Sequence, residues 1–96
     1  MSPQYISSLS FIKSLAQRRD IAFKYLTHAE IEMAKDGITQ PDVQNALENC
    51  FSVQEQTHPG GTRYLVKGKD TDDRTITVVI EIEEEIVTIV IVTGWK

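Results

Sequence analysis

Four side chains carry the groups that phosphodiester cleavage without a metal requires: His28, Arg63, Tyr64 and Arg74. Cations hold a phosphate as negative charge builds on it, while imidazole and phenol groups move protons, so these residue types match metal-free RNA cleavage. Arg63, Tyr64, Lys67 and Arg74 form the only basic and aromatic group of the expected sheet. On a regular strand Arg63 and Lys67 share one face and Tyr64 lies on the other, unless a bulge merges them. The alternative interpretation is an ordinary solvated strand.

His28 follows Thr27 at the expected start of a helix. An imidazole at the positive end of a helix can act as an acid or a base, which is the functional interpretation of His28. A second hydrogen-bonding residue at the start of the helix is an equally good interpretation.

Metal-ligating and nucleophilic patterns are weak. His28 and Glu32 lie four apart on a helix, but no second histidine or paired cysteine completes a tetrahedral set. The acidic loop 70–73 lacks the glycine and distal glutamate of an EF-hand. Cys50 lies on an apolar helical stripe, where cysteine behaves as a small hydrophobic residue. We therefore expect no metal and no other cofactor.

Length and composition favour one small domain over residues 1–96, with 41% hydrophobic and 25% charged residues. A single cysteine and the absence of a basic, apolar leader favour the cytoplasm, and no apolar stretch is long enough to cross a membrane. The net charge of -4 is uneven, because residues 1–35 carry five basic and three acidic groups and residues 36–96 carry five and eleven. This acidity opposes strong nonspecific binding to nucleic acid.

Helical signals fill the first half of the chain. Apolar residues at helical spacing predict a helix from about Ser8 to Arg19, followed by extended chain at residues 21–25. The alternative is one continuous helix through both segments. A second helix is expected to begin at Thr27, whose side chain would form a capping box with Glu30. Gly37 should end this helix, since glycine readily adopts the left-handed conformation.

A third helix is expected from Thr39, which caps it, to about Asn49, with Pro41 and Asp42 in the first turn. Beyond this helix, from Phe51 on, the apolar residues recur at every second position, which is typical of strands. Strands are predicted in a hairpin on either side of a turn at residues 58–61, with Phe51 and Val53 in the first strand and Thr62 to Lys67 as the second, and then at Arg74 to Ile82 and Ile86 to Thr93.

The expected fold class is therefore α+β, with N-terminal helices packed on one face of a C-terminal antiparallel sheet of about four strands. The segment from Ile86 to Val92 is apolar on both sides. Part of the second face should thus be covered by the first helix, by a ligand or by another subunit.

Several short runs carry a family resemblance. They are residues 23–29, Met33, residues 35–39, Asp42-Val43, Ala46-Leu47, Arg63-Tyr64, residues 74–80 and residues 91–93. This pattern resembles a family of small uncharacterised bacterial domains with His-Ala, Arg-Met and Arg-Gly-Ile signatures, over about residues 23–95. Glu32 and Asp36 stand where arginine is usual. The family looks like a branch of the RelE superfamily, which includes BrnT and MqsR, and the order of helices before sheet is similar to MqsR.

The resemblance implies a RelE-like toxin that cleaves messenger RNA, alone or on the ribosome, with an antitoxin protein as its inhibitory partner. A ribose 2′-hydroxyl would attack the neighbouring phosphate and leave a cyclic phosphate, with no metal. By position His28, Arg63, Tyr64 and Arg74 are the implied catalytic residues, and Lys67 and Lys24 would contact RNA.

A noncatalytic interaction module is the rival interpretation. The apolar second face and the net charge of -4 are its basis. Such a module, an inactive member of the family, would bind a partner or form a homodimer through the sheet.

Overall fold

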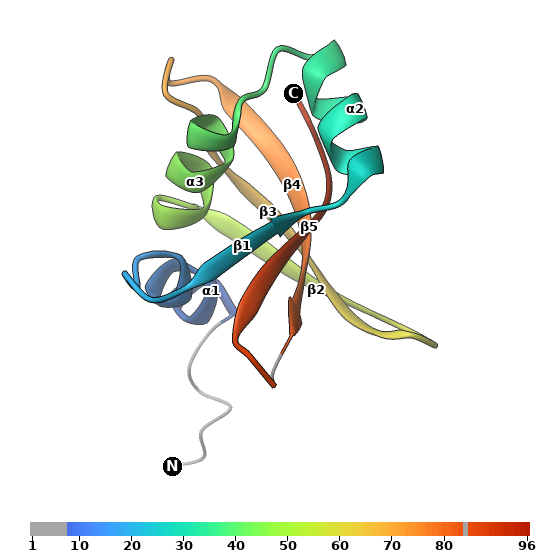
Figure 1. Ribbon diagram of the computed structural model, residues 1–96. Helices are drawn as coiled ribbons and strands as arrows, with labels where there is room; N and C mark the ends of the chain where they lie inside the picture. Colours follow the sequence, from blue (N-terminus) through green and yellow to red (C-terminus); the bar gives the residue numbers. More distant parts are fainter. Residues whose placement is uncertain (1–7, 84) are drawn as a thin grey trace.

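The computed structural model describes residues 8–83 and 85–96; the acidic segment 83–85, which separates the last two expected strands, includes Glu84, which lies outside these ranges. The first half of the chain holds the three helices and one strand, and the second half holds four consecutive strands (Figure 1). The elements are α1 Ser8–Ala16, β1 Ala22–Tyr25, α2 Thr27–Lys35, α3 Gln40–Glu48, β2 Ser52–His58, β3 Gly61–Lys69, β4 Thr75–Glu83 and β5 Thr88–Trp95. The expected α+β class is confirmed.

The sheet differs from the expected one, because it has five strands and is mixed. Its order is β1-β5-β4-β3-β2, with β1 parallel to β5 and all other neighbours antiparallel. The expected extended segment at residues 21–25 supplies the extra strand, in which Phe23 pairs with Ile89. The prediction of an antiparallel four-stranded sheet was wrong because the partner of β1 lies more than 60 residues away, beyond any local pattern.

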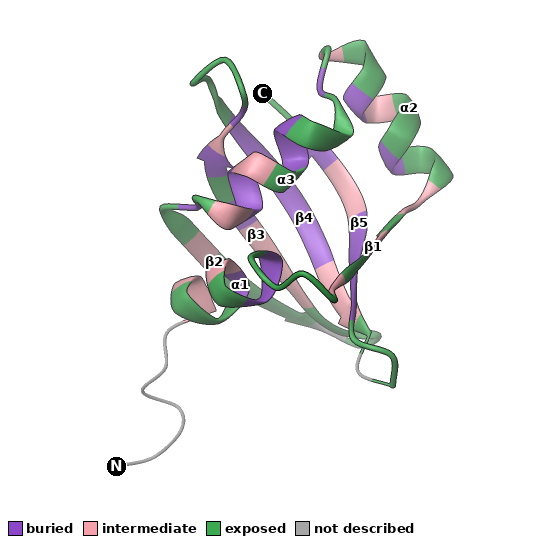
Figure 2. Cartoon of the chain, turned by 60° about the vertical axis from the view of Figure 1, so that its left-hand side comes forward, coloured by how far each residue is buried: buried purple, intermediate pink, exposed green. Residues whose placement is uncertain are grey.

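All three helices lie on one face of the sheet (Figure 2). Helix α2 packs on β5, α3 packs on β3, and α1 packs beside α3 and over β2. The core lies between the layers and includes Ile12, Met33, Val43, Leu47, Val66, Ile76, Val78, Ile80, Ile89 and Ile91. Cys50 is buried with them, as expected.

The opposite face of the sheet, which we call the open face, has no helix over it among the described residues. Cover by the first helix was one of the three expected possibilities, and it was wrong because Ile12 and Leu15 of α1 join the core on the other side. Val79 and Val90 on the open face are nevertheless only 8% and 5% exposed. Side chains of neighbouring strands therefore cover them.

The end of α2 follows its sequence signal and the start does not. Gly37 has a φ of 68°, and the N–H of Ile38 donates to the carbonyl of Met33 at 2.9 Å, which closes the helix as predicted. The capping box expected at Thr27 was wrong: Leu26 occupies the cap position and no side chain caps the helix. Thr27 instead lies inside the first turn, because the strand pairing of β1 fixes the chain up to Tyr25.

Helix α3 begins as the sequence predicts. The Thr39 hydroxyl accepts from the Asp42 N–H at 3.2 Å, and Asp42 Oδ2 accepts from the Thr39 N–H at 2.9 Å. Helix α1 is shorter than expected and ends at Ala16. Arg18 lies beyond it, where its guanidinium binds the carboxylate of Asp20 at 2.6 Å.

No helix among the described residues is long and apolar enough to cross a membrane.

Candidate active site

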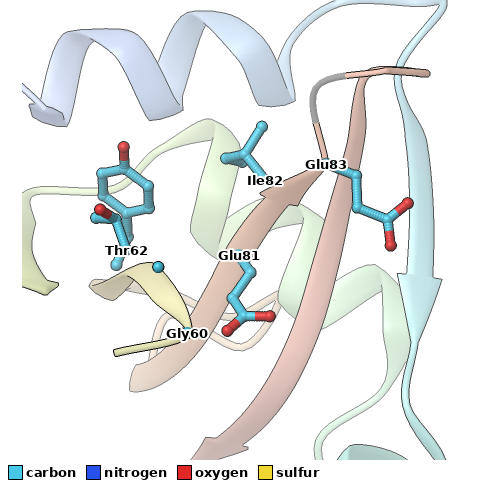
Figure 3. Close-up of a pocket in the computed structure, with 7 residues that line it drawn as sticks. Gly60, Thr62, Glu81, Ile82 and Glu83 are labelled. Carbon is cyan, nitrogen blue, oxygen red and sulfur yellow. The ribbon is translucent and has the colours of Figure 1, made fainter. Parts of the chain in front are cut away.

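A cleft opens where β3 and β4 separate. The two strands pair from Lys69 and Thr75 to Tyr64 and Ile80, and no further, while β3 continues its pairing with β2 to Gly61. The cavity between them has a volume of about 330 Å³ (Figure 3). Its lining consists of Gly60, Gly61, Thr62, Tyr64, Glu81, Ile82 and Glu83.

An ion pair links the two strands beside this cleft. Nε of Arg63 donates to Oε2 of Glu81 at 2.9 Å, and both side chains are about a third to two-fifths exposed. Figure 3 shows the Glu81 carboxylate directed toward Gly60. Exposed ion pairs contribute little to stability, so a phosphate can compete for the guanidinium at low cost. Glu81 was missed in the sequence because only the register of β3 and β4 places it beside Arg63.

Tyr64 reaches the same cleft from the helix side of the sheet. It packs against the core cluster, and its ring centroid lies 6.4 Å from that of Phe11. Arg63 and Tyr64 are therefore on opposite faces, as the period of two predicts. The bulge considered from the sequence does not merge them, since the irregularity lies between β4 and β5 at Val79 and Ile80. Tyr64 lines the cleft where β3 and β4 separate, and Arg63 lies beside it through its contact with Glu81.

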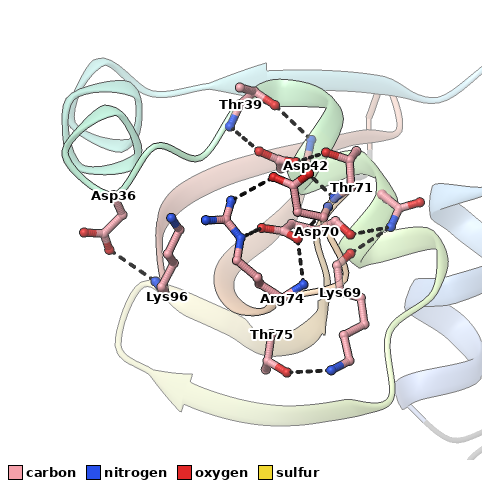
Figure 4. A network of polar contacts seen from close by, with 11 residues as sticks. Asp36, Thr39, Asp42, Lys69, Asp70, Thr71, Arg74, Thr75 and Lys96 are labelled. Carbon is pink, nitrogen blue, oxygen red and sulfur yellow. Dashed lines mark hydrogen bonds and ion pairs between the residues drawn. The ribbon is translucent and has the colours of Figure 1, made fainter.

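Arg74 lies at the far end of β3. Its Nε donates to Asp70 Oδ2 at 2.9 Å, and its Nη2 donates to Asp72 Oδ2 at 3.3 Å (Figure 4). Burial alone would raise the pKa of Asp70, but the backbone N–H groups of Arg74 and Asp72 and the Arg74 guanidinium lower it below its ordinary value. Arg74 directly precedes Thr75, which pairs with Lys69 of β3. Lys69 is six residues from Arg63 along this strand, so their Cα atoms are about 20 Å apart. Arg74 is thus held away from the cleft.

His28 is exposed in the first turn of α2, which packs on β5. It is absent from the lining of the cleft. Of the four predicted residues, Tyr64 lines the cleft, Arg63 contacts Glu81 of its lining, and His28 and Arg74 lie elsewhere. The catalytic roles of all four stay predictions.

The two cations expected to contact RNA are both on the open face. Lys24 lies beside Val90, and its Nζ is 3.7 Å from Glu83 Oε1. Lys67 is exposed opposite Thr77. By register this face carries four cations and two carboxylates from described strand residues: Lys24, Arg63, Lys67, Lys69, Glu81 and Glu83. The open face is locally positive although the chain is acidic.

Among residues 8–83 and 85–96, no group of three or more histidine, cysteine, aspartate or glutamate side chains is placed to hold a metal ion.

A comparison with protein families matches residues 25–94 to the model described as Domain of unknown function (DUF4258). The match runs from the last residue of β1 to Gly94 in β5, so it includes the cleft and leaves α1 and Trp95 outside. No curated protein matches the chain.

Proposed function

We propose that this chain, which belongs to the DUF4258 family, is a metal-free endoribonuclease of the RelE-like toxin type. RNA would be cleaved at the mouth of the cleft between β3 and β4. An antitoxin protein would be its inhibitory partner.

One observation carries the proposal: the 2.9 Å contact between Arg63 and Glu81 beside a cleft that Tyr64 also lines. Glu81 would take the proton of a ribose 2′-hydroxyl as its oxygen bonds to the phosphorus. The bond from phosphorus to the 5′ oxygen would break, and the Tyr64 hydroxyl would give its proton to that oxygen. Arg63 would neutralise the charge that builds on the phosphate. The products are a 2′,3′-cyclic phosphate and a free 5′-hydroxyl.

The locally positive open face supports this reaction, because Lys24 and Lys67 on it can attract RNA toward the cleft. The overall charge of -4 then limits binding elsewhere on the surface.

Induced expression in a bacterial host tests the proposal. Wild-type protein should arrest growth, and purified protein should cut RNA, with or without ribosomes, to ends that carry a cyclic phosphate. Arg63→Ala, Glu81→Gln and Tyr64→Phe should each lower the cleavage rate by about 100-fold or more.

Lys35→Ala is the matched control, because Lys35 is exposed on α2 and pairs with Glu32 of the same helix. It should cut RNA at the wild-type rate. Normal growth together with uncut RNA under all conditions contradicts the enzyme.

The second candidate is a noncatalytic interaction module. Its support is the apolar centre of the open face, where Leu65, Val79 and Val90 lie with no helix over them. A stable homodimer or complex would bury this strip. Sedimentation as a monomer, with no partner in pull-down experiments, contradicts this candidate.

A further inference from the structure

Trp95 presents its indole on the open face. It pairs with Thr77 across β5 and β4, whereas the preceding Gly94 faces the Met33 side chain of α2. Because side chains alternate along a strand, Trp95 lies on the side away from the helices. It is 41% exposed, although tryptophan is ordinarily among the more buried residues.

Two lysines of β3 lie near this indole on the same face. Lys67 pairs with Thr77, so its Cα is two strands, or about 10 Å, from that of Trp95. Lys69 pairs with Thr75, and its Nζ donates to the Thr75 hydroxyl at 3.1 Å. Neither ammonium lies within ion-pair distance of a carboxylate among the described residues, whereas Arg63 and Lys24 both do.

The backbone on either side of the Trp95 side chain is anchored. The N–H of Lys96 donates to Asp36 Oδ2 at 3.2 Å, directly after Trp95 (Figure 4). Pairing with β4 fixes the backbone on the other side. Because the backbone is already ordered here, a ligand that stacks on the indole does not have to order this part of the chain.

We infer that Trp95, Lys67 and Lys69 form a binding site for single-stranded RNA. A nucleobase stacks on the indole, and the lysines hold the adjoining phosphates. This inference rests on the proposed function and deepens it, since it names the substrate class and a binding residue outside the cleft. An exposed aromatic beside cations without carboxylate partners suits a polyanion with flat bases better than an apolar protein surface.

The site is continuous with the cleft. Lys67 and Arg63 lie four residues apart on the same face of β3, which is about 13 Å. A strand stacked at Trp95 can therefore run along β3 to the ion pair of Arg63 and Glu81.

The chain holds a single tryptophan, so its fluorescence reports on this site alone. The probe is a 2′-O-methyl hexauridylate, which lacks the attacking hydroxyl and stays uncut on wild-type protein. Titration should quench the emission to saturation. Rising salt should weaken binding, and Lys67→Ala should reduce the salt slope by about 0.7.

Substitutions at the indole are followed by anisotropy of a labelled copy of the same oligomer. Trp95→Ala should weaken binding by about tenfold or more, and Trp95→Phe should retain most of it. Phe11→Ala is the matched control, because Phe11 is also 41% exposed but belongs to α1, on the other side of the sheet. It should bind as wild type does. If Trp95→Ala does not fold, the double variant Lys67→Ala, Lys69→Ala gives the same test.

The outcomes separate this inference from the nuclease. Tight binding that depends on Trp95, without cleavage of ordinary RNA, retains the binding site and removes the enzyme. Cleavage with no quenching, at a rate that Trp95→Ala leaves unchanged, overturns the binding site alone. Self-association that Trp95→Ala abolishes, with no RNA binding, also overturns it, because a second copy then covers the face.

Discussion

Asp42 and Thr71 join the start of α3 to the loop between β3 and β4. Oδ1 of Asp42 accepts from the Thr71 N–H at 3.0 Å and from the Thr71 hydroxyl at 2.5 Å, although the residues are 29 apart in sequence (Figure 4). The other oxygen accepts from the Thr39 N–H. The Thr71 hydroxyl, followed by the Thr39 N–H, holds the pKa of Asp42 well below its usual range. One carboxylate thus caps a helix and fastens a loop.

Asp42→Asn should remove a part of the stability that depends on pH. The folded-state pKa is lowered, so the carboxylate stabilises the fold fully above its unfolded pKa of about 3.9 and loses this effect as pH falls toward the folded pKa. We expect the variant to lose about 1 to 3 kcal/mol of unfolding free energy at pH 7, and less at pH 2.5. Urea unfolding at both values measures this. An equal loss at both would contradict the ionic role.

Arg74→Ala should lower the melting temperature and spare RNA cleavage. Its guanidinium binds Asp70, which is only 2% exposed, so the substitution leaves a buried carboxylate without its cation. Arg63→Ala should abolish cleavage and leave the melting temperature nearly unchanged, because the ion pair of Arg63 is exposed. Thermal melts beside cleavage assays per mole of folded protein compare the two. Lost cleavage at an unchanged melting temperature would return Arg74 to the catalytic set.

Gly68→Ala should destabilise the fold by roughly 3 kcal/mol or more. A Cβ at Gly68 would overlap the carbonyl of Ala46, where α3 lies against β3, and neither backbone segment can move without breaking its own hydrogen bonds. Gly94→Ala is the comparison, since its added carbon would come no closer than 3.4 Å to Thr77. Circular dichroism melts should rank Gly68→Ala far below it. Equal melting temperatures would contradict the close approach.

Local sequence signals predicted helix ends correctly where the hydrogen-bond partners are close neighbours in the sequence. The cap at Thr39 and Asp42 and the glycine closure at Gly37 both involve partners within five residues, and both were predicted. At Thr27 an equally good local signal failed, because strand pairing of the preceding residues sets the start of α2. Tertiary pairing overrides a cap worth only about 1 kcal/mol.

The candidate site depended on contacts that a local pattern does not contain. Alternation along the strand placed Arg63 and Tyr64 on opposite faces correctly, but the cleft that Tyr64 and Glu81 line arises where β3 and β4 separate. Glu81 enters only through the register of β4 against β3. By contrast, Asp70 lies four residues before Arg74, so the structural role of that arginine was readable from the acidic loop.

His28→Ala should leave toxicity and cleavage unchanged. The side chain is exposed on α2 and is absent from the lining of the cleft, where the proposed proton transfers fall to Glu81 and Tyr64. An exposed substitution of this kind alters stability by less than about 0.5 kcal/mol, so expression should match the wild type. Growth after induction is compared for His28→Ala, Tyr64→Phe and the control Lys35→Ala. If cells that express His28→Ala grow normally although the melting temperature of the variant is unchanged, the variant has lost its toxicity. Histidine rather than tyrosine then supplies the proton, and the reaction moves from the cleft toward α2.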